Sequence, residues 1–159
     1  MLLAGMLVEQ LYDALRRRDT DAAVGLLHPA CVGLTCPGLP HVGGRVAYGP
    51  QEWLSRIWVE TYRHFDVVAV PEEHLQVGTG TVVTLGTYRG VARGTGRVFE
   101  AWFAHVWTVL DGRVSGLRQV TDTARWAAAL DQSATSVGDP ERHKGDAADS
   151  GPAYSQGRE

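Results

Sequence analysis

The chain has 159 residues, a formal net charge of −3 and 44% hydrophobic side chains, which is enough for one domain with a hydrophobic core but not for two. Its one dense basic run, residues 16–18, is not repeated elsewhere. A nucleic-acid surface needs a broad basic face, so we do not expect a nucleic-acid partner. We expect the three arginines to lie against the negative C-terminal end of the first helix.

The beginning of the chain predicts neither a secretory leader nor a membrane span. Residues 1–8 are apolar, but they lack a basic segment and the charged Glu9 and Asp13 follow directly. The two cysteines, Cys31 and Cys36, fall on opposite faces of an extended segment, which disfavours a disulfide. We therefore expect a cytoplasmic protein without a membrane partner.

Three helices are predicted in the first half of the chain. The first begins at Leu3, where apolar residues recur at three- and four-residue steps: Met6, Leu7, Leu11, Ala14 and Leu15. A second, short helix begins at Asp19 or Thr20 and ends before His28-Pro29. After a short strand over residues 31–35 and a loop over 37–44, Gly49-Pro50 opens a third helix that runs to about His64.

Four stretches rich in β-forming residues follow, at residues 66–71, 74–89, 98–110 and 113–121. Glycines at 94 and 96 and Asp111-Gly112 supply the positive φ angles of tight turns, so hairpins join the last three. A short helix over residues 124–130 comes next, with an evident N-cap. The remainder is polar and cannot bury enough surface to order itself. We expect one domain at residues 1–131 and a disordered tail at 132–159.

Two segments carry a resemblance to a known family. The sequence from Phe99 to Val114, FEAWFAHVWTVLDGRV, and its continuation LRQVTDT resemble the last two strands of SnoaL-like polyketide cyclases in the NTF2-like superfamily. Residues 45–62 resemble the helix that roofs their pocket, and the likeness covers about residues 7–131. It implies an α+β cone (a cystatin-like roll), in which a curled, mostly antiparallel sheet packs on three N-terminal helices and a short C-terminal helix follows.

His105 is the leading acid/base candidate. In such a cone, alternate residues of a strand point into the pocket, and one parity of the long strand gives Phe103, His105 and Trp107. Burial would lower the pKa of the imidazole and keep it neutral, which suits proton abstraction next to a carbonyl. A histidine whose hydrogen bonds are merely satisfied within the sheet is an equally good interpretation.

Three further residues complete the candidate catalytic set. The resemblance aligns Gln119 with a position where the family carries an acidic residue, so Gln119 can orient a substrate or donate to an oxyanion but cannot take a proton. Tyr88 could donate a hydrogen bond into the pocket, although packing at its mouth explains it equally well. Asp122 could supply the missing carboxylate, against its role as a helix N-cap.

Aromatic residues form the candidate binding wall. Trp53, Trp58 and Tyr62 recur along the third helix, and Phe103 and Trp107 flank His105. An aromatic stripe at helical spacing is also typical of a core, so we expect one or two of the three helix residues to face the pocket. The histidines show no metal-ligand spacing and no glycine motif for a nucleotide is present, which predicts neither metal nor cofactor.

The resemblance implies an enzyme of secondary metabolism, such as antibiotic biosynthesis, and a homodimer. Our first hypothesis is a cofactor-independent cyclase or isomerase, of the lyase or isomerase class, that enolises a small hydrophobic, aromatic or polyketide-like substrate. A protein that binds a hydrophobic metabolite without transforming it is the alternative, favoured by the absent carboxylates. A hydrolase or dehydratase of the same fold would look alike in sequence, because one fold hosts many chemistries.

Overall fold

The computed structural model describes residues 3–133. The helices are α1 (Leu3–Arg16), α2 (Thr20–Gly25), α3 (Gly49–Glu52), the π-helical η1 (Trp53–Val59), α4 (Glu60–His64) and α5 (Thr123–Leu130). The strands are β1 (Leu27–Leu34), β2 (Val46–Tyr48), β3 (Phe65–Val77), β4 (Thr81–Ala92), β5 (Val98–Leu110) and β6 (Arg113–Thr121). Part of the predicted tail, residues 134–159, lies outside the described residues.

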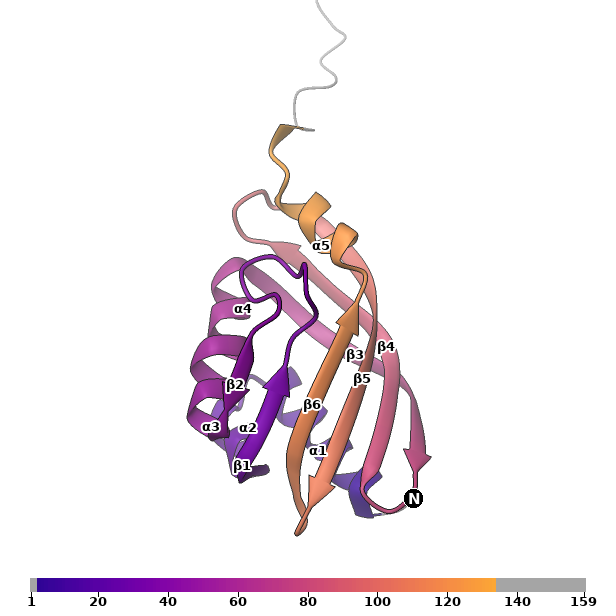
Figure 1. Cartoon of the computed structure of the whole chain (residues 1–159). Coiled ribbons are helices and arrows are strands. Elements are labelled where there is room, and N and C mark those ends of the chain that lie inside the picture. The colour runs from indigo at the N-terminus through magenta and orange to yellow at the C-terminus, as the bar shows by residue number, and fades with distance from the viewer. Residues whose placement is uncertain (1–2, 134–159) are drawn as a thin grey trace, which may run out of the picture.

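The six strands form one curled sheet in the order β2-β1-β6-β5-β4-β3. Only the β1 and β6 pairing is parallel, and the other four are antiparallel. The helices from α1 to α4 cover the concave side of the sheet, and α5 lies at one end of it (Figure 1). The predicted α+β class, with a mostly antiparallel curled sheet on three N-terminal helical segments, is therefore confirmed.

The predicted division between the first two β-rich stretches is wrong. We expected strands at residues 66–71 and 74–89, whereas β3 continues to Val77 and β4 begins at Thr81. The turn between them contains Gly78 at φ 62°, a backbone conformation that glycine adopts without strain. Pro71 lies inside β3, which is possible because β3 is an edge strand and its register shifts between Pro71 and Glu73.

Helix α1 buries a slightly different face from the one predicted. Met6 is 46% exposed, whereas the apolar contact surface includes Val8, Leu11 and Tyr12, which are almost fully buried. These three positions recur at three- and four-residue steps, so they share one side of the helix. That side faces the sheet and brings Tyr12 into the interior.

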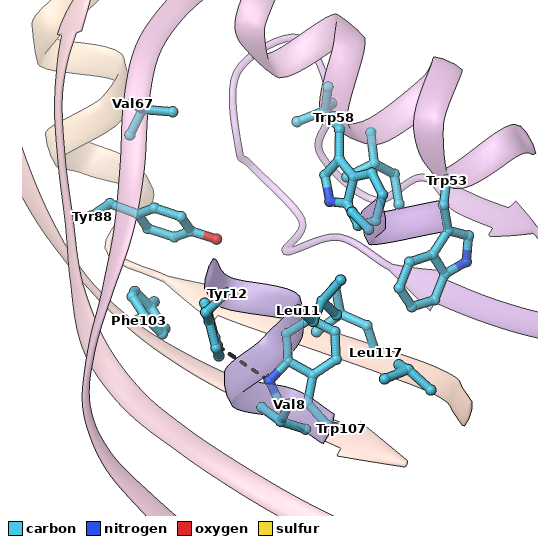
Figure 2. Close-up of a cluster of buried hydrophobic side chains, with 14 of the residues drawn as sticks. Val8, Leu11, Tyr12, Trp53, Trp58, Val67, Tyr88, Phe103, Trp107 and Leu117 are labelled. Atoms are coloured by element: carbon cyan, nitrogen blue, oxygen red, sulfur yellow. Dashed lines mark hydrogen bonds between the residues drawn. The ribbon is translucent and has the colours of Figure 1, made fainter. Parts of the chain in front are cut away.

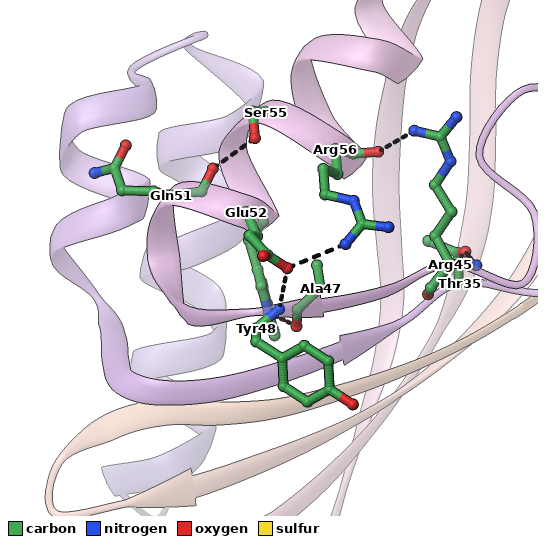
Figure 3. A network of polar contacts seen from close by, with 9 residues as sticks. Thr35, Arg45, Ala47, Tyr48, Gln51, Glu52, Ser55 and Arg56 are labelled. Atoms are coloured by element: carbon green, nitrogen blue, oxygen red, sulfur yellow. Dashed lines mark hydrogen bonds and ion pairs between the residues drawn. The ribbon is translucent and has the colours of Figure 1, made fainter.

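The third predicted helix is continuous from Gly49 to His64, but its middle part is π-helical. Glu52 fixes its beginning, because its carboxylate accepts hydrogen bonds from the Tyr48 amide (2.9 Å) and from Arg56 (3.2 Å), as Figure 3 shows. A π turn holds residues five apart on nearly the same side. Trp53 and Trp58, five apart, accordingly make an edge-to-face contact with ring centroids 6.1 Å apart.

The three arginines at the C-terminal end of α1 do not act together as predicted. Arg16 lies in the last turn of α1 and pairs with Asp13 on the surface. Arg18 instead reaches β3, where it donates to the Val67 carbonyl at 2.8 Å, and its guanidinium lies 3.9 Å from the ring centroid of Tyr62. Arg18 therefore ties α4 and β3 together rather than capping the helix.

Candidate functional site

A cavity lies between the concave side of the sheet and the helices α1, η1 and α4. Its walls are largely apolar and aromatic, and its volume is about 70 Å³. Four of its polar side chains, Tyr12, Tyr88, His105 and Gln119, form one connected group, and Arg16, Thr61 and Tyr62 also line the cavity. Among residues 3–133, no carboxylate lines this cavity. Figure 2 shows the hydroxyl of Tyr88 directed from β4 toward the helix that carries Trp58.

His105 occupies the centre of the polar region. It lies on β5, with Thr84 of β4 and Gln119 of β6 directly opposite on the neighbouring strands. Its side chain is buried, and both ring nitrogens are engaged. Nδ1 lies 2.6 Å from the hydroxyl of Tyr12, and Nε2 lies 2.7 Å from the hydroxyl of Tyr88. His105 therefore reaches a ligand through the tyrosines rather than through a free nitrogen.

Neighbouring donors fix the two tyrosine hydroxyls. Gln119 donates from Nε2 to the hydroxyl of Tyr88 at 2.6 Å, while its own Oε1 accepts from the backbone amide of Cys36 at 3.3 Å. The indole of Trp107 donates to the hydroxyl of Tyr12 at 3.2 Å, the contact dashed in Figure 2. Each tyrosine oxygen thus accepts one hydrogen bond from a fixed donor before His105 is considered.

Burial keeps all three ring side chains neutral. It lowers the pKa of His105 to about 3, because the interior solvates an imidazolium poorly. The same loss of water raises the pKa of Tyr12 and of Tyr88 far above the usual range of a phenol. The cluster consequently carries no net charge at neutral pH, and its chemistry depends on where its protons lie.

A count of hydrogens shows that the cluster has two arrangements. A neutral imidazole has one N–H and one acceptor nitrogen, so one tyrosine donates to His105 and the other accepts from it. If Nε2 carries the hydrogen, Tyr88 accepts from both His105 and Gln119, and its own O–H is left to donate into the cavity. If Nδ1 carries it, Tyr88 donates to His105 instead.

The predicted binding residues divide into two groups. Trp58, Tyr62 and Trp107 line the cavity. Trp53 and Phe103 do not: the Trp53 ring packs against Gly33 of β1, and Phe103 lies behind His105 with ring centroids 4.2 Å apart. One residue of the helix trio is therefore core, and Phe103 supports the imidazole from behind.

Of the predicted catalytic residues, His105, Gln119 and Tyr88 come together and Asp122 does not. Asp122 precedes α5 at the N-cap position, but its side chain makes no capping hydrogen bond. It lines a separate surface depression with Trp102 and Arg125. β6 ends at Thr121, directly before Asp122, and Asp122 is not among the residues that line the cavity.

Sequence analysis missed two residues of the site, Tyr12 and Trp126. Tyr12 could have been found from its place on the apolar side of α1, four residues after Val8. Trp126 of α5 closes one end of the cavity and packs edge-on against Tyr88, with ring centroids 4.9 Å apart. Nothing local in the sequence shows that the C-terminal helix folds back over β4.

Comparisons with known proteins place this geometry in a family. A family model described as a SnoaL-like domain matches residues 8–117. An NTF2-like protein of Burkholderia thailandensis is 26% identical with a TM-score of 0.74, over 82% of this chain and 99% of that one. An NTF2-like protein of unknown function from Burkholderia pseudomallei is 27% identical with a TM-score of 0.75, over 82% and 98%. No curated protein sequence matches.

A third similar structure has a named assignment. IdmH, a candidate polyketide cyclase from Streptomyces antibioticus, is 27% identical to this chain with a TM-score of 0.66, over 80% of this chain and 97% of its own. These matches confirm the predicted NTF2-like, SnoaL-like fold. Two further observations concern the described residues 3–133: no helix there is long and apolar enough to cross a membrane, and no three His, Cys, Asp or Glu side chains are grouped to hold a metal ion.

Proposed function

We propose that this chain, which belongs to the SnoaL-like family, is an enzyme. Its own side chains would transfer protons to and from a small hydrophobic carbonyl compound. The observation that carries the proposal is the hydrogen-bonded series Gln119, Tyr88, His105 and Tyr12 along one wall of an apolar cavity. A buried series of this kind has little purpose in packing alone, because an apolar core would avoid the cost of placing polar groups there.

Tyr88 is the residue that meets the substrate. Two of its partners, Gln119 and His105, can both donate to the phenolic oxygen, which leaves the O–H for a ligand oxygen in the cavity. A hydrogen bond from a fixed donor in a dry site stabilises the negative charge that forms on a carbonyl oxygen during enolisation. His105 acts through Tyr88, and Gln119 orients it.

Tyr88 and His105 together can also accept a proton from the substrate. When Tyr88 passes its hydrogen to Nε2 of His105, its oxygen is ready to take a hydrogen from the substrate. No separated charge forms in the dry interior if the Nδ1 hydrogen of His105 passes at the same time to the hydroxyl oxygen of Tyr12, and Tyr12 releases its own hydrogen to water in the surface cleft that it also lines. This exchange suits enolisation and ring closure of a polyketide-like ketone, the reaction class of a cyclase or isomerase in secondary metabolism.

The test is deuterium uptake from D₂O into β-tetralone and related aromatic ketones, read by mass spectrometry. We expect uptake above the protein-free rate with the wild type, and a rate about a hundredfold lower with Tyr88→Phe, because general acid/base groups contribute at least this much. Tyr48→Phe is the matched control, since Tyr48 is an exposed tyrosine 63% accessible to solvent. Equal rates for wild type and Tyr88→Phe would refute the assignment.

A binding protein is the second candidate, favoured by the absence of a carboxylate among the lining residues in the described chain. Quenching of tryptophan fluorescence separates the two, because Trp58, Trp107 and Trp126 line the cavity and report on occupancy. Ketones that quench the fluorescence but take up no deuterium would identify a protein that stores or carries its ligand.

We also propose that the chain forms a homodimer through the outer face of the sheet. Val32, Trp102 and Val120 are exposed on β1, β5 and β6, where a soluble monomer would expose apolar side chains only sparsely. Sedimentation should find a dimer for the wild type and a monomer for Trp102→Glu. A monomeric wild type would contradict this part of the proposal.

A further inference from the structure

The cavity opens toward solvent on one side, between the C-terminal end of α1, α4 and β3. Its lining residues from η1, β4, β5, β6 and α5 are all buried. The lining residues that are accessible to solvent come from the other three elements: Leu15, Arg16, Thr61, Tyr62, Val68 and Ala69. These accessible residues therefore form the mouth of the cavity.

Arg16 is the one charged side chain among the residues of the described chain, 3–133, that line the cavity. It lies in the last turn of α1, four positions after Tyr12. One helix turn, about 6 Å along the axis, therefore separates it from the tyrosine that contacts His105. The positive charge thus lies at the mouth, while the neutral polar series from Tyr12 to Tyr88 lies in the interior.

The guanidinium of Arg16 has donors to spare. Within residues 3–133 it makes one hydrogen bond, from Nη2 to the carboxylate of Asp13 at 2.7 Å, and both side chains are largely exposed. A guanidinium carries five N–H donors, so several remain for a ligand. The neighbouring arginines are placed differently, because Arg17 does not line the cavity and Arg18 is held by β3 and by the ring of Tyr62.

The size of the cavity brings part of a ligand to this mouth. Its volume of about 70 Å³ is about half that of an engineered cavity of about 150 Å³ that encloses benzene. A ketone with two fused rings is therefore not fully enclosed. When its carbonyl lies at Tyr88, its far end lies in the mouth, beside Arg16.

We propose that Arg16 binds a carboxylate of the substrate while Tyr88 binds its carbonyl oxygen, which makes the substrate an aromatic keto acid. The inference rests on the proposed function, since that function assigns the carbonyl to Tyr88. The planar guanidinium can hold both oxygens of a carboxylate. A singly charged group also suits the mouth better than a phosphate, because aspartates already pair with Arg16 and Arg18.

A pair of ligands tests the site: a β-tetralone that carries a carboxylate on its aromatic ring, and the methyl ester of the same compound. Quenching of tryptophan fluorescence reports both affinities, since three tryptophans line the cavity. We expect the wild type to bind the acid about fivefold more tightly than the ester, the size of a favourable exposed ion pair. Arg16→Gln should remove this preference. Arg17→Gln, the matched control at a neighbouring arginine that does not line the cavity, should keep it.

Asp13→Asn gives a second, opposite effect. It removes the carboxylate that competes for the guanidinium, so we expect the affinity for the acid to rise about twofold while that for the ester stays the same. If Arg16 and Asp13 only stabilised α1, the two substitutions would act alike. The inference is overturned by a wild type that binds acid and ester equally, by a preference that survives in Arg16→Gln, or by an affinity for the acid that does not rise in Asp13→Asn.

Deuterium uptake separates this inference from the proposed function. Uptake into neutral β-tetralone, together with equal affinities for the acid and the ester, would defeat the Arg16 site alone. A preference for the acid that depends on Arg16, without uptake into any of the ketones, would defeat the proposed enzyme and keep the site as that of a protein that binds keto acids.

Discussion

At the level of single residues, the site depends on one imidazole held between two phenols. His105 contacts Tyr12 and Tyr88 through its two nitrogens, and its ring lies nearly parallel to that of Tyr12, with 3° between the planes. Burial keeps the imidazole neutral, so it can exchange one hydrogen for another but does not hold an extra proton. This property distinguishes it from an exposed histidine, which titrates near neutral pH.

The buried neutral histidine predicts a pH dependence of stability. The unfolded chain protonates His105 below its ordinary pKa of 6.5, while the folded chain leaves it neutral down to about 3. The unfolded state thus binds more protons in this window, so stability falls as the pH drops, by up to about 1.4 kcal/mol per pH unit. Above about pH 6.5 this contribution is complete and constant.

Urea unfolding at several values between about pH 7 and about pH 4 measures this effect. We expect the free energy of unfolding to fall less steeply for His105→Gln than for the wild type, because glutamine has no such titration. His28→Gln, at a histidine outside the cavity, serves as the control and should keep the wild-type slope. The same slope in wild type and His105→Gln would show that His105 is solvated in the folded state.

At the level of elements, the π-helical segment explains how one helix serves both core and cavity. Trp53 packs on Gly33 of β1, and its indole donates to the Ala47 carbonyl at 3.2 Å. Trp58, one π turn later, reaches the cavity lining. The approach of η1 to β1 therefore depends on a residue without a side chain at position 33.

Replacing Gly33 with alanine tests this packing. The added Cβ would lie 2.8 Å from Cε2 of Trp53, closer than carbon atoms approach, so the indole must move. We expect Gly33→Ala to destabilise the protein by about 1–3 kcal/mol, the usual cost of overpacking. Gly25→Ala is the matched control, because nothing lies within 4 Å of its added Cβ. Equal unfolding midpoints for the two variants would contradict the account.

The sequence predicted most of the helices and strands. It did not predict the π-helical segment or which face of α1 is buried. Hydrophobic spacing located α1, the helix from Gly49 and the two long hairpin strands, since these patterns are local. The π segment could not be predicted, because the spacing of the same residues also fits an α-helix. The predicted break after residue 71 does not exist, since an edge strand tolerates a proline.

At the level of the whole molecule, the curl of the sheet brings together residues that are remote in sequence. Tyr12 and His105 are separated by 93 positions and yet are hydrogen-bonded. Strand parity predicted that His105 shares a face with Phe103 and Trp107, but parity cannot tell which residues meet a cavity and which lie behind it. Tyr12 and Trp126 come from the two ends of the domain, so only the folded chain shows their roles.

The central claim is that the hydroxyl of Tyr88 donates to the oxygen of a bound ketone. The direct measurement is the ¹³C resonance of β-tetralone labelled at its carbonyl carbon and bound to the protein. A hydrogen bond withdraws electron density from that carbon, so we predict a downfield resonance in the wild-type and Tyr48→Phe complexes and a return toward the unbonded position in Tyr88→Phe. The same resonance in the wild-type and Tyr88→Phe complexes would contradict the assignment of Tyr88 to the substrate.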